Sequence, residues 1–133
     1  MLPISKAIEI CTVKIIGKIG PFTVRLVDNK LTKAIISLYN KDSIDIVEGD
    51  NCYHNPKVVP FDEIWILYYD PNDKDEQRYI LLHEYVEATL MRDRHMSYDD
   101  AHIQADKIEL FNRQKDLLPL IKRIVNASPR KKN

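Results

Sequence analysis

Residues 79–91 read Tyr-Ile-Leu-Leu-His-Glu-Tyr-Val-Glu-Ala-Thr-Leu-Met, and this stretch decides the fold of the second half of the chain. Its apolar residues recur at three- and four-residue spacing, which predicts an α-helix with one buried face: Tyr79, Leu82, Val86 and Leu90. His83 and Glu87 are four residues apart, so they lie one turn apart on one side of that helix, inside its apolar arc. A carboxylate among apolar groups is costly unless another group pairs with it or a metal ion binds it. Glu87 is therefore the residue that most needs an explanation.

The sequence His83-Glu84-x-x-Glu87 is typical of a metal site on one face of a helix. It differs by one residue from the His-Glu-x-x-His pattern of zinc peptidases, in which two ligands share a helical face. In that pattern the Glu that follows the first ligand is the general base acting on metal-bound water. Carboxylate oxygen is also an accepted zinc ligand, so Glu87 can replace the second His. A structural interpretation competes: His83 would be a core histidine hydrogen-bonded to a neighbour, with Glu87 at the edge of the buried stripe.

Length and composition indicate one ordinary globular domain. The chain has 133 residues, of which 44% are hydrophobic and 30% charged, and we expect a single domain over residues 1–127. The formal net charge is zero, which gives no argument for nucleic acid or an anionic membrane as a partner. No signal peptide or transmembrane stretch is evident, and Cys11 and Cys52 do not form a Cys-x-x-Cys pair. We therefore expect a cytoplasmic protein with reduced thiols.

The first half of the chain is rich in β-branched and aromatic residues and is predicted to form strands. The predicted strands are residues 8–16, 22–27, 43–47 and 63–69, with a possible short strand at Val58-Val59. Residues 31–39 fit either a strand or a short helix. Because strands come first and helices second, the fold class is α+β: a mostly antiparallel N-terminal sheet packed against two or three C-terminal helices.

Capping residues predict where the helices begin. Asp73 and Glu76 form a capping box for the central helix, which should end near residues 92–95. Ser97 and Asp100 start a second helix that should run to about Lys115, followed by a short helix over residues 117–125. Residues 128–133 form a basic tail that we expect to be disordered.

The second helix supplies further metal-ligand side chains. His102, Asp106 and Glu109 follow one another at four- and three-residue spacing and so share a helical face. Two helices joined by a short connection pack antiparallel, which brings His102 opposite His83 and Glu87. Three protein ligands with an open fourth position is the arrangement of catalytic zinc.

These segments together resemble the minimal core of the zincins. The order of strand, short loop, His83-Glu84-x-x-Glu87 helix and a further helix is similar to gluzincin-like metallopeptidases of the ImmA/IrrE type, over roughly residues 63–111. The resemblance implies that His83 and Glu87 are metal ligands, that Glu84 is the general base, and that the next helix supplies the third ligand. The gluzincin pattern has a Glu as third ligand, so Glu109 competes with His102 for that role. The implied ion is Zn²⁺, and the carboxylate in place of the second His also suits Mn²⁺ or Fe²⁺.

Three functions fit these observations. The first is a small metal-dependent hydrolase, most simply a peptidase, in which residues 64–69 would pair with an extended peptide if that strand lies at the sheet edge. Tyr98 or His54 would then support the oxyanion. The second is a degenerate zincin that acts as a metal-binding or interaction module on a partner protein. The third is an all-helical nucleotide pyrophosphohydrolase in which Glu84 and Glu87 hold Mg²⁺. The sequence indicates neither the substrate nor the oligomeric state.

Overall fold

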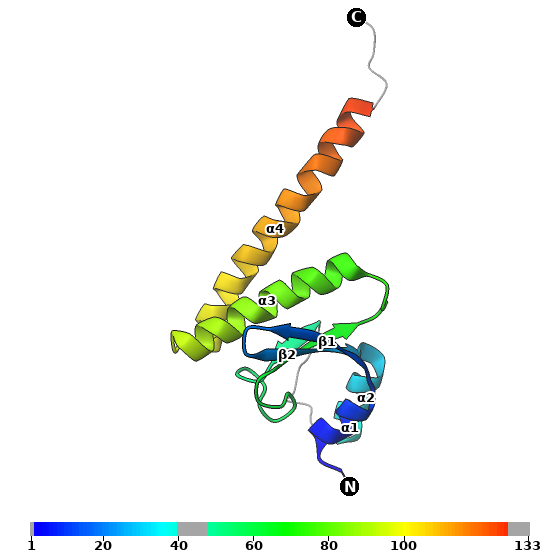
Figure 1. Ribbon diagram of the computed structural model, residues 1–133, viewed down its shortest axis with the longest axis vertical. Coiled ribbons are helices and arrows are strands. Elements are labelled where there is room, and N and C mark those ends of the chain that lie inside the picture. The colour runs from blue at the N-terminus through cyan, green and yellow to red at the C-terminus, as the bar shows by residue number, and fades with distance from the viewer. Residues whose placement is uncertain (1, 40–47, 128–133) are drawn as a thin grey trace, which may run out of the picture.

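The computed structural model of the protein describes residues 2–39 and 48–127 (Figure 1). Its elements, in chain order, are α1 (Ile4–Ile10), β1 (Thr12–Ile19), β2 (Phe22–Asp28), α2 (Asn29–Leu38), β3 (Gly49–Asn51), β4 (Glu63–Tyr68), α3 (Lys74–Asp93) and α4 (Tyr98–Ala127). Among the described residues, no helix has both the length and the hydropathy that crossing a membrane requires. The predicted strand at residues 43–47 and the predicted disordered tail at residues 128–133 lie outside the described residues.

The four strands form one mixed sheet in the order β1-β2-β4-β3. The pairs β1–β2 and β3–β4 are antiparallel, whereas β2 and β4 are parallel. A parallel pair needs a long crossover connection, and α2 lies in the connection between β2 and β4. The predicted α+β class and the mostly antiparallel sheet are therefore confirmed. The four-stranded sheet contradicts the all-helical architecture that the pyrophosphohydrolase alternative requires.

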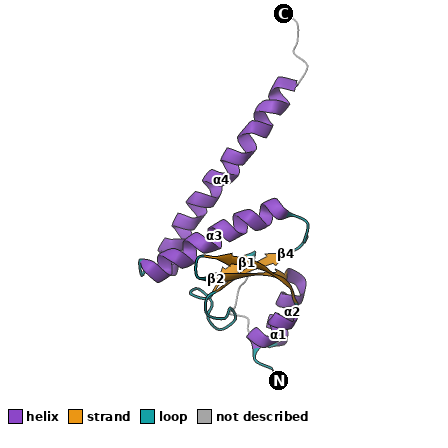
Figure 2. Ribbon diagram, viewed as in Figure 1, coloured by secondary structure: helices purple, strands orange, loops and turns teal. Residues whose placement is uncertain are grey.

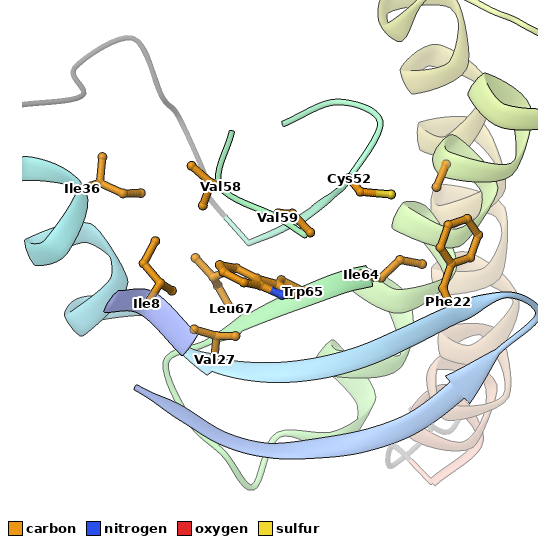
Figure 3. Packing of buried hydrophobic residues seen from close by; sticks show 11 residues of the cluster. Ile8, Phe22, Val27, Ile36, Cys52, Val58, Val59, Ile64, Trp65 and Leu67 are labelled. Atoms are coloured by element: carbon orange, nitrogen blue, oxygen red, sulfur yellow. The ribbon is translucent and has the colours of Figure 1, made fainter. Parts of the chain in front are cut away.

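Helices cover both faces of the sheet, as Figure 2 shows. On the face of α1 and α2, Trp65 and Leu67 of β4 pack in one cluster with Ile8 and Ile36 (Figure 3). On the face of α3, a second cluster is formed by Val24, Leu26, Ile66 and Ile80. Because β4 lies between β2 and β3 and is covered on both sides, residues 64–67 are all buried.

Two local predictions in the first half are corrected, and one that the sequence leaves open is decided. Residues 8–16 do not form one strand, because α1 ends at Ile10 and β1 starts at Thr12. Of the ambiguous residues 31–39, all but the C-cap Tyr39 belong to α2, whose N-cap Asp28 accepts a hydrogen bond from the Leu31 backbone N–H at 2.9 Å. Residues 58–59 form a turn whose two side chains are fully buried, so their hydrophobicity reflects core packing and not a strand.

The C-terminal helices begin at the predicted caps. Asp73 accepts from the Glu76 backbone N–H at 3.1 Å, and Ser97 accepts from the Asp100 backbone N–H at 3.2 Å. α4, however, is one helix of 30 residues that continues through Pro119, so the predicted break near Lys115 is wrong. Proline removes one backbone N–H donor and bends a helix, but it need not end one.

α3 and α4 pack side by side through small residues and a set of ion pairs. Ala101 and Ala105 of α4 are fully buried and allow a close approach of the two helices. Farther along α4, Arg113 binds both carboxylate oxygens of Glu76, at 2.8 and 2.7 Å. The remainder of α4 extends beyond the end of α3 (Figure 1).

We predict that Gly49→Ala destabilises the protein by about 1–3 kcal/mol, because β3 lies too close to α3 for a side chain at this position. A Cβ on Gly49 would lie 2.7 Å from Ile80 Cγ2 and 3.0 Å from the Trp65 carbonyl oxygen. Urea denaturation followed by circular dichroism measures the change. Ser37→Ala, on the exposed side of α2, is the control and should change stability by less than about 0.5 kcal/mol. Equal stability of Gly49→Ala and the parent would contradict this packing.

Candidate metal centre

The buried carboxylate of Glu87 lies at the meeting point of α3 and α4. Glu87 is only 1% exposed. Its Oε2 lies 3.1 Å from His83 Nε2 and 2.8 Å from His102 Nδ1, and the two ring nitrogens are 3.2 Å apart. The structure thus brings together one turn of α3 and the first turns of α4, as the spacing in the sequence predicts.

The triangle of His83, Glu87 and His102 atoms is close in size to a set of metal ligands. Ligands bound about 2.1 Å from one tetrahedral ion lie roughly 3.4 Å from one another. The three atoms of His83, Glu87 and His102 are slightly closer than that, as expected where hydrogen bonds rather than an ion hold them. Two imidazoles and one carboxylate are also the ligand types that zinc accepts. The geometry and the chemistry of these residues fit a first-row divalent ion.

Two further carboxylates lie on the outer side of the histidine rings. Glu109 Oε1 is 2.9 Å from His83 Nδ1, but this buried nitrogen makes no hydrogen bond within residues 2–39 and 48–127, because the oxygen is out of line with the N–H direction. Asp106 lies 3.4 Å from His83 Nδ1 and 3.4 Å from His102 Nε2. Metal-binding histidines commonly donate their second N–H to a carboxylate, and Glu109 and Asp106 are carboxylates close to His83 Nδ1. In the structure Glu109 therefore has the place of such an outer partner, on the opposite side of the His83 ring from Glu87 and His102.

Glu84 lies beside the triangle and is held by a residue of the sheet. It is 6% exposed, and its Oε1 accepts a hydrogen bond from Asn51 Nδ2 at 3.0 Å. The same Asn51 amide group donates to Glu87 Oε1, also at 3.0 Å. Burial and the neighbouring carboxylates of Glu87 and Asp50 raise the pKa of Glu84 well above its ordinary value. A carboxyl group with a raised pKa is suited to exchanging protons near neutral pH.

The pKa of His83 is also raised, whereas that of Glu87 is lowered. Burial disfavours the charged form of His83, but its hydrogen bond to Glu87 and the charges of nearby carboxylates outweigh burial and raise its pKa from 6.5 to about 9. Burial likewise disfavours the Glu87 carboxylate, but the hydrogen bonds to His83 and His102 lower its pKa overall. Without a metal, the cluster is therefore an ion pair of a protonated His83 and an ionised Glu87.

A cavity of ≈ 420 Å³ opens onto these side chains. Its wall is made by residues of β3, the following loop, α3 and α4: Glu48, Gly49, Asp50, His54, His83, Glu84, Glu87, Tyr98, His102 and Asp106. His54 stacks on the Tyr98 ring with centroids 3.6 Å apart, and His54 Nδ1 lies 2.8 Å from Asp50 Oδ1. Burial and the surrounding carboxylates raise the pKa of Tyr98, so its hydroxyl keeps its proton. The two residues predicted to support an oxyanion thus lie in the wall of the same cavity.

The sequence did not indicate Asn51 or Asp50 as part of the site. Both are buried polar residues on β3, but the run Glu48-Gly49-Asp50-Asn51 has the composition of a turn. Residues 64–69 do not meet the condition of lying at the sheet edge, because β4 pairs on both sides. Within the described residues, β3 and β1 are the edge strands, and β3 is the one that borders the cavity.

Comparison with known proteins gives no match: no protein-family model, no curated protein and no solved structure matches the chain. The similarity to gluzincins therefore remains a prediction from the motif and the order of the elements.

We predict that the affinity for Zn²⁺ rises with pH up to about pH 9. His83 must lose its proton to bind a metal, and its pKa is raised from 6.5 to about 9 in the metal-free protein. Below pH 9 each unit of increasing pH should therefore tighten binding by about tenfold, with the release of about one proton per ion bound. Competition against a chromophoric chelator from pH 6.5 to 9 measures this slope. A constant affinity between pH 7 and pH 9 would contradict the assignment of His83 as a protonated ligand.

Proposed function

We propose that the protein is a metal-dependent hydrolase, most simply a small zinc-type peptidase, with His83, Glu87 and His102 as the metal ligands. The observation that carries the proposal is the triangle of these three ligand atoms, with the buried carboxyl group of Glu84 beside it in an open cavity. Zn²⁺ is the proposed ion, and Mn²⁺ or Fe²⁺ would also suit a site with this carboxylate content.

Each residue of the site has one role in the proposed hydrolysis. An ion held by the triangle would act as a Lewis acid on a substrate carbonyl and make a water molecule more acidic. Glu84 accepts the proton of the attacking water and passes it to the leaving amine. Asn51 positions Glu84 for this task, because its amide group binds Glu84 and Glu87 at the same time. The Tyr98 hydroxyl, 3.3 Å from His102 Nδ1, is placed to donate a hydrogen bond to the oxyanion.

An extended peptide is the substrate form that fits the edge of the sheet. β3 ends the sheet within the described residues, and Gly49 and Asp50 of β3, with Glu48 just before it, line the wall of the cavity. Backbone groups at a sheet edge can pair with an added strand, which would lead a peptide past Glu84. We place this activity in the cytoplasm, because Cys11 and Cys52 are both free thiols.

A metal-binding module without catalysis is the second candidate function. It is favoured by the burial of Glu84, which is 6% exposed and hydrogen-bonded to Asn51, because a general base must reach the attacking water. The two candidates share the metal and differ in whether Glu84 is needed. Two separate experiments therefore test them.

The metal is tested first. We predict that untagged protein, stripped with a chelator and titrated with Zn²⁺, binds one ion per chain, and that His83→Ala weakens binding at least about 100-fold. His95→Asn is the matched control, because His95 is exposed and Asn tolerates its positive φ of 53°. Isothermal titration calorimetry measures both. Equal binding by His83→Ala and the parent would contradict the metal centre.

Catalysis is tested with Glu84→Gln. This isosteric change should keep the bound metal and lower peptide hydrolysis by at least about 10³-fold, because it removes the only proposed proton acceptor. Mass spectrometry of a mixed peptide library incubated with the zinc-loaded protein measures cleavage. Equal cleavage by Glu84→Gln and the parent would contradict the mechanism. Metal binding with no cleavage of any peptide would support the non-catalytic module.

A further inference from the structure

The second half of α4 presents a row of large apolar side chains to solvent. Six residues, each between 49% and 65% exposed, form what we call the apolar face of α4: Leu110, Phe111, Leu117, Leu118, Ile121 and Val125. At 100° per residue these positions fall within one arc of the helix. Ile103, 50% exposed, continues the arc toward the start of α4.

The apolar face is not the side of α4 that packs on α3. The contacts with α3 run through Ala101, Ala105, Arg113 and Asp116, which lie on a different arc of the helix. Asp116 accepts hydrogen bonds from Tyr79 and Arg78 at 2.6 and 3.0 Å, close to the start of α3. Residues 117–127 extend past this point, so α3 does not cover them (Figure 1).

Exposure of the apolar face of α4 to water is energetically unfavourable. Its six apolar side chains expose on the order of 600 Å², which is the upper end of what a monomer normally exposes in one patch. A projecting helical segment of about ten residues is also too short to be stable through its own hydrogen bonds. A second surface that covers the apolar face would both remove this apolar area from water and stabilise the projecting helical segment.

We propose that this surface is the α4 helix of a second copy of the chain, packed antiparallel. The spacing supports a helix partner, because Ile103, Leu110 and Leu117 follow one another at intervals of seven, and Phe111, Leu118 and Val125 do the same. Gln114 lies within this arc, and a single polar residue in such a seam commonly defines how two helices align.

The charges along α4 favour the antiparallel orientation. Residues 98–113 carry four carboxylates and two cationic side chains, whereas residues 114–127 carry three cationic side chains and one carboxylate. In an antiparallel pair, the basic half of each helix lies along the acidic half of the other, and in a parallel pair like charges face each other. Polar residues that flank the apolar face would add to the buried area and bring it toward the roughly 800 Å² per partner of an ordinary stable interface.

Pro119 is consistent with this arrangement. It lies two residues after Leu117, and so about 200° around the helix, on the side away from the apolar face. The carbonyl oxygen that proline leaves without a hydrogen bond then faces water instead of the interface. A helix bends away from its proline side, which would curve α4 toward its partner.

Analytical ultracentrifugation of the full chain tests the proposal. At about 50 µM the protein should sediment as a dimer, and Leu117→Glu should weaken dimerisation at least about 30-fold by placing a charge in the apolar face. Asn126→Glu is the control for the added charge, because Asn126 lies about 120° around α4 from the middle of the apolar face, and it should weaken the dimer far less than Leu117→Glu. Far-ultraviolet circular dichroism and zinc binding confirm that each variant is folded.

A double substitution tests the orientation. Lys115→Gln with Lys122→Gln removes the excess positive charge from residues 114–127, and both side chains flank the apolar face. It should weaken an antiparallel dimer by about 3- to 10-fold and make it less sensitive to salt, whereas it should strengthen a parallel dimer. A monomer at 50 µM, a Leu117→Glu variant that remains dimeric, or a double variant that dimerises more tightly than the parent would each overturn the proposal.

Discussion

The burial of one carboxylate, that of Glu87, is the constraint on which the rest of the structure depends. At 1% exposure this group needs charged or polar partners on every side. The partners come from three separate elements: His83 from the same helix, His102 from α4 and Asn51 from β3. Both α4 and β3 must therefore pack closely against α3. The glycine of β3 and the buried alanines of α4 are the small residues that permit this packing.

The part of the site on the two C-terminal helices was predictable from the sequence. Helical periodicity fixes how His83, Glu84 and Glu87 are placed relative to one another, and the short connection to Ser97 forces the next helix to run antiparallel. These two rules suffice to bring His102 to Glu87. They do not decide which nitrogen of His83 faces which carboxylate. That choice depends on the separation of the two helices and places Glu109 behind the ring instead of beside Glu87.

The contribution of the sheet was not predictable in the same way. Asn51 is more than thirty residues from Glu84 and Glu87, and its neighbours Gly49 and Asp50 have the composition of a turn. Nothing local in the sequence predicts that β3 pairs with β4 and forms an edge of the sheet among the described residues. The order of strands depends on the parallel crossover through α2, and residues 31–38 fit a strand as well as a helix until Asp28 is known to cap them.

The central claim is that His83, Glu87 and His102 bind one metal ion, and an anomalous-diffraction experiment tests it most directly. Crystals grown with Zn²⁺ and measured on both sides of the zinc absorption edge would locate the ion from its scattering alone. We predict one strong anomalous peak about 2.0–2.2 Å from His83 Nε2, a Glu87 carboxylate oxygen and His102 Nδ1, with Glu84 beside it but not bound. An empty cluster, or a zinc ion found only elsewhere on the protein, would contradict the claim.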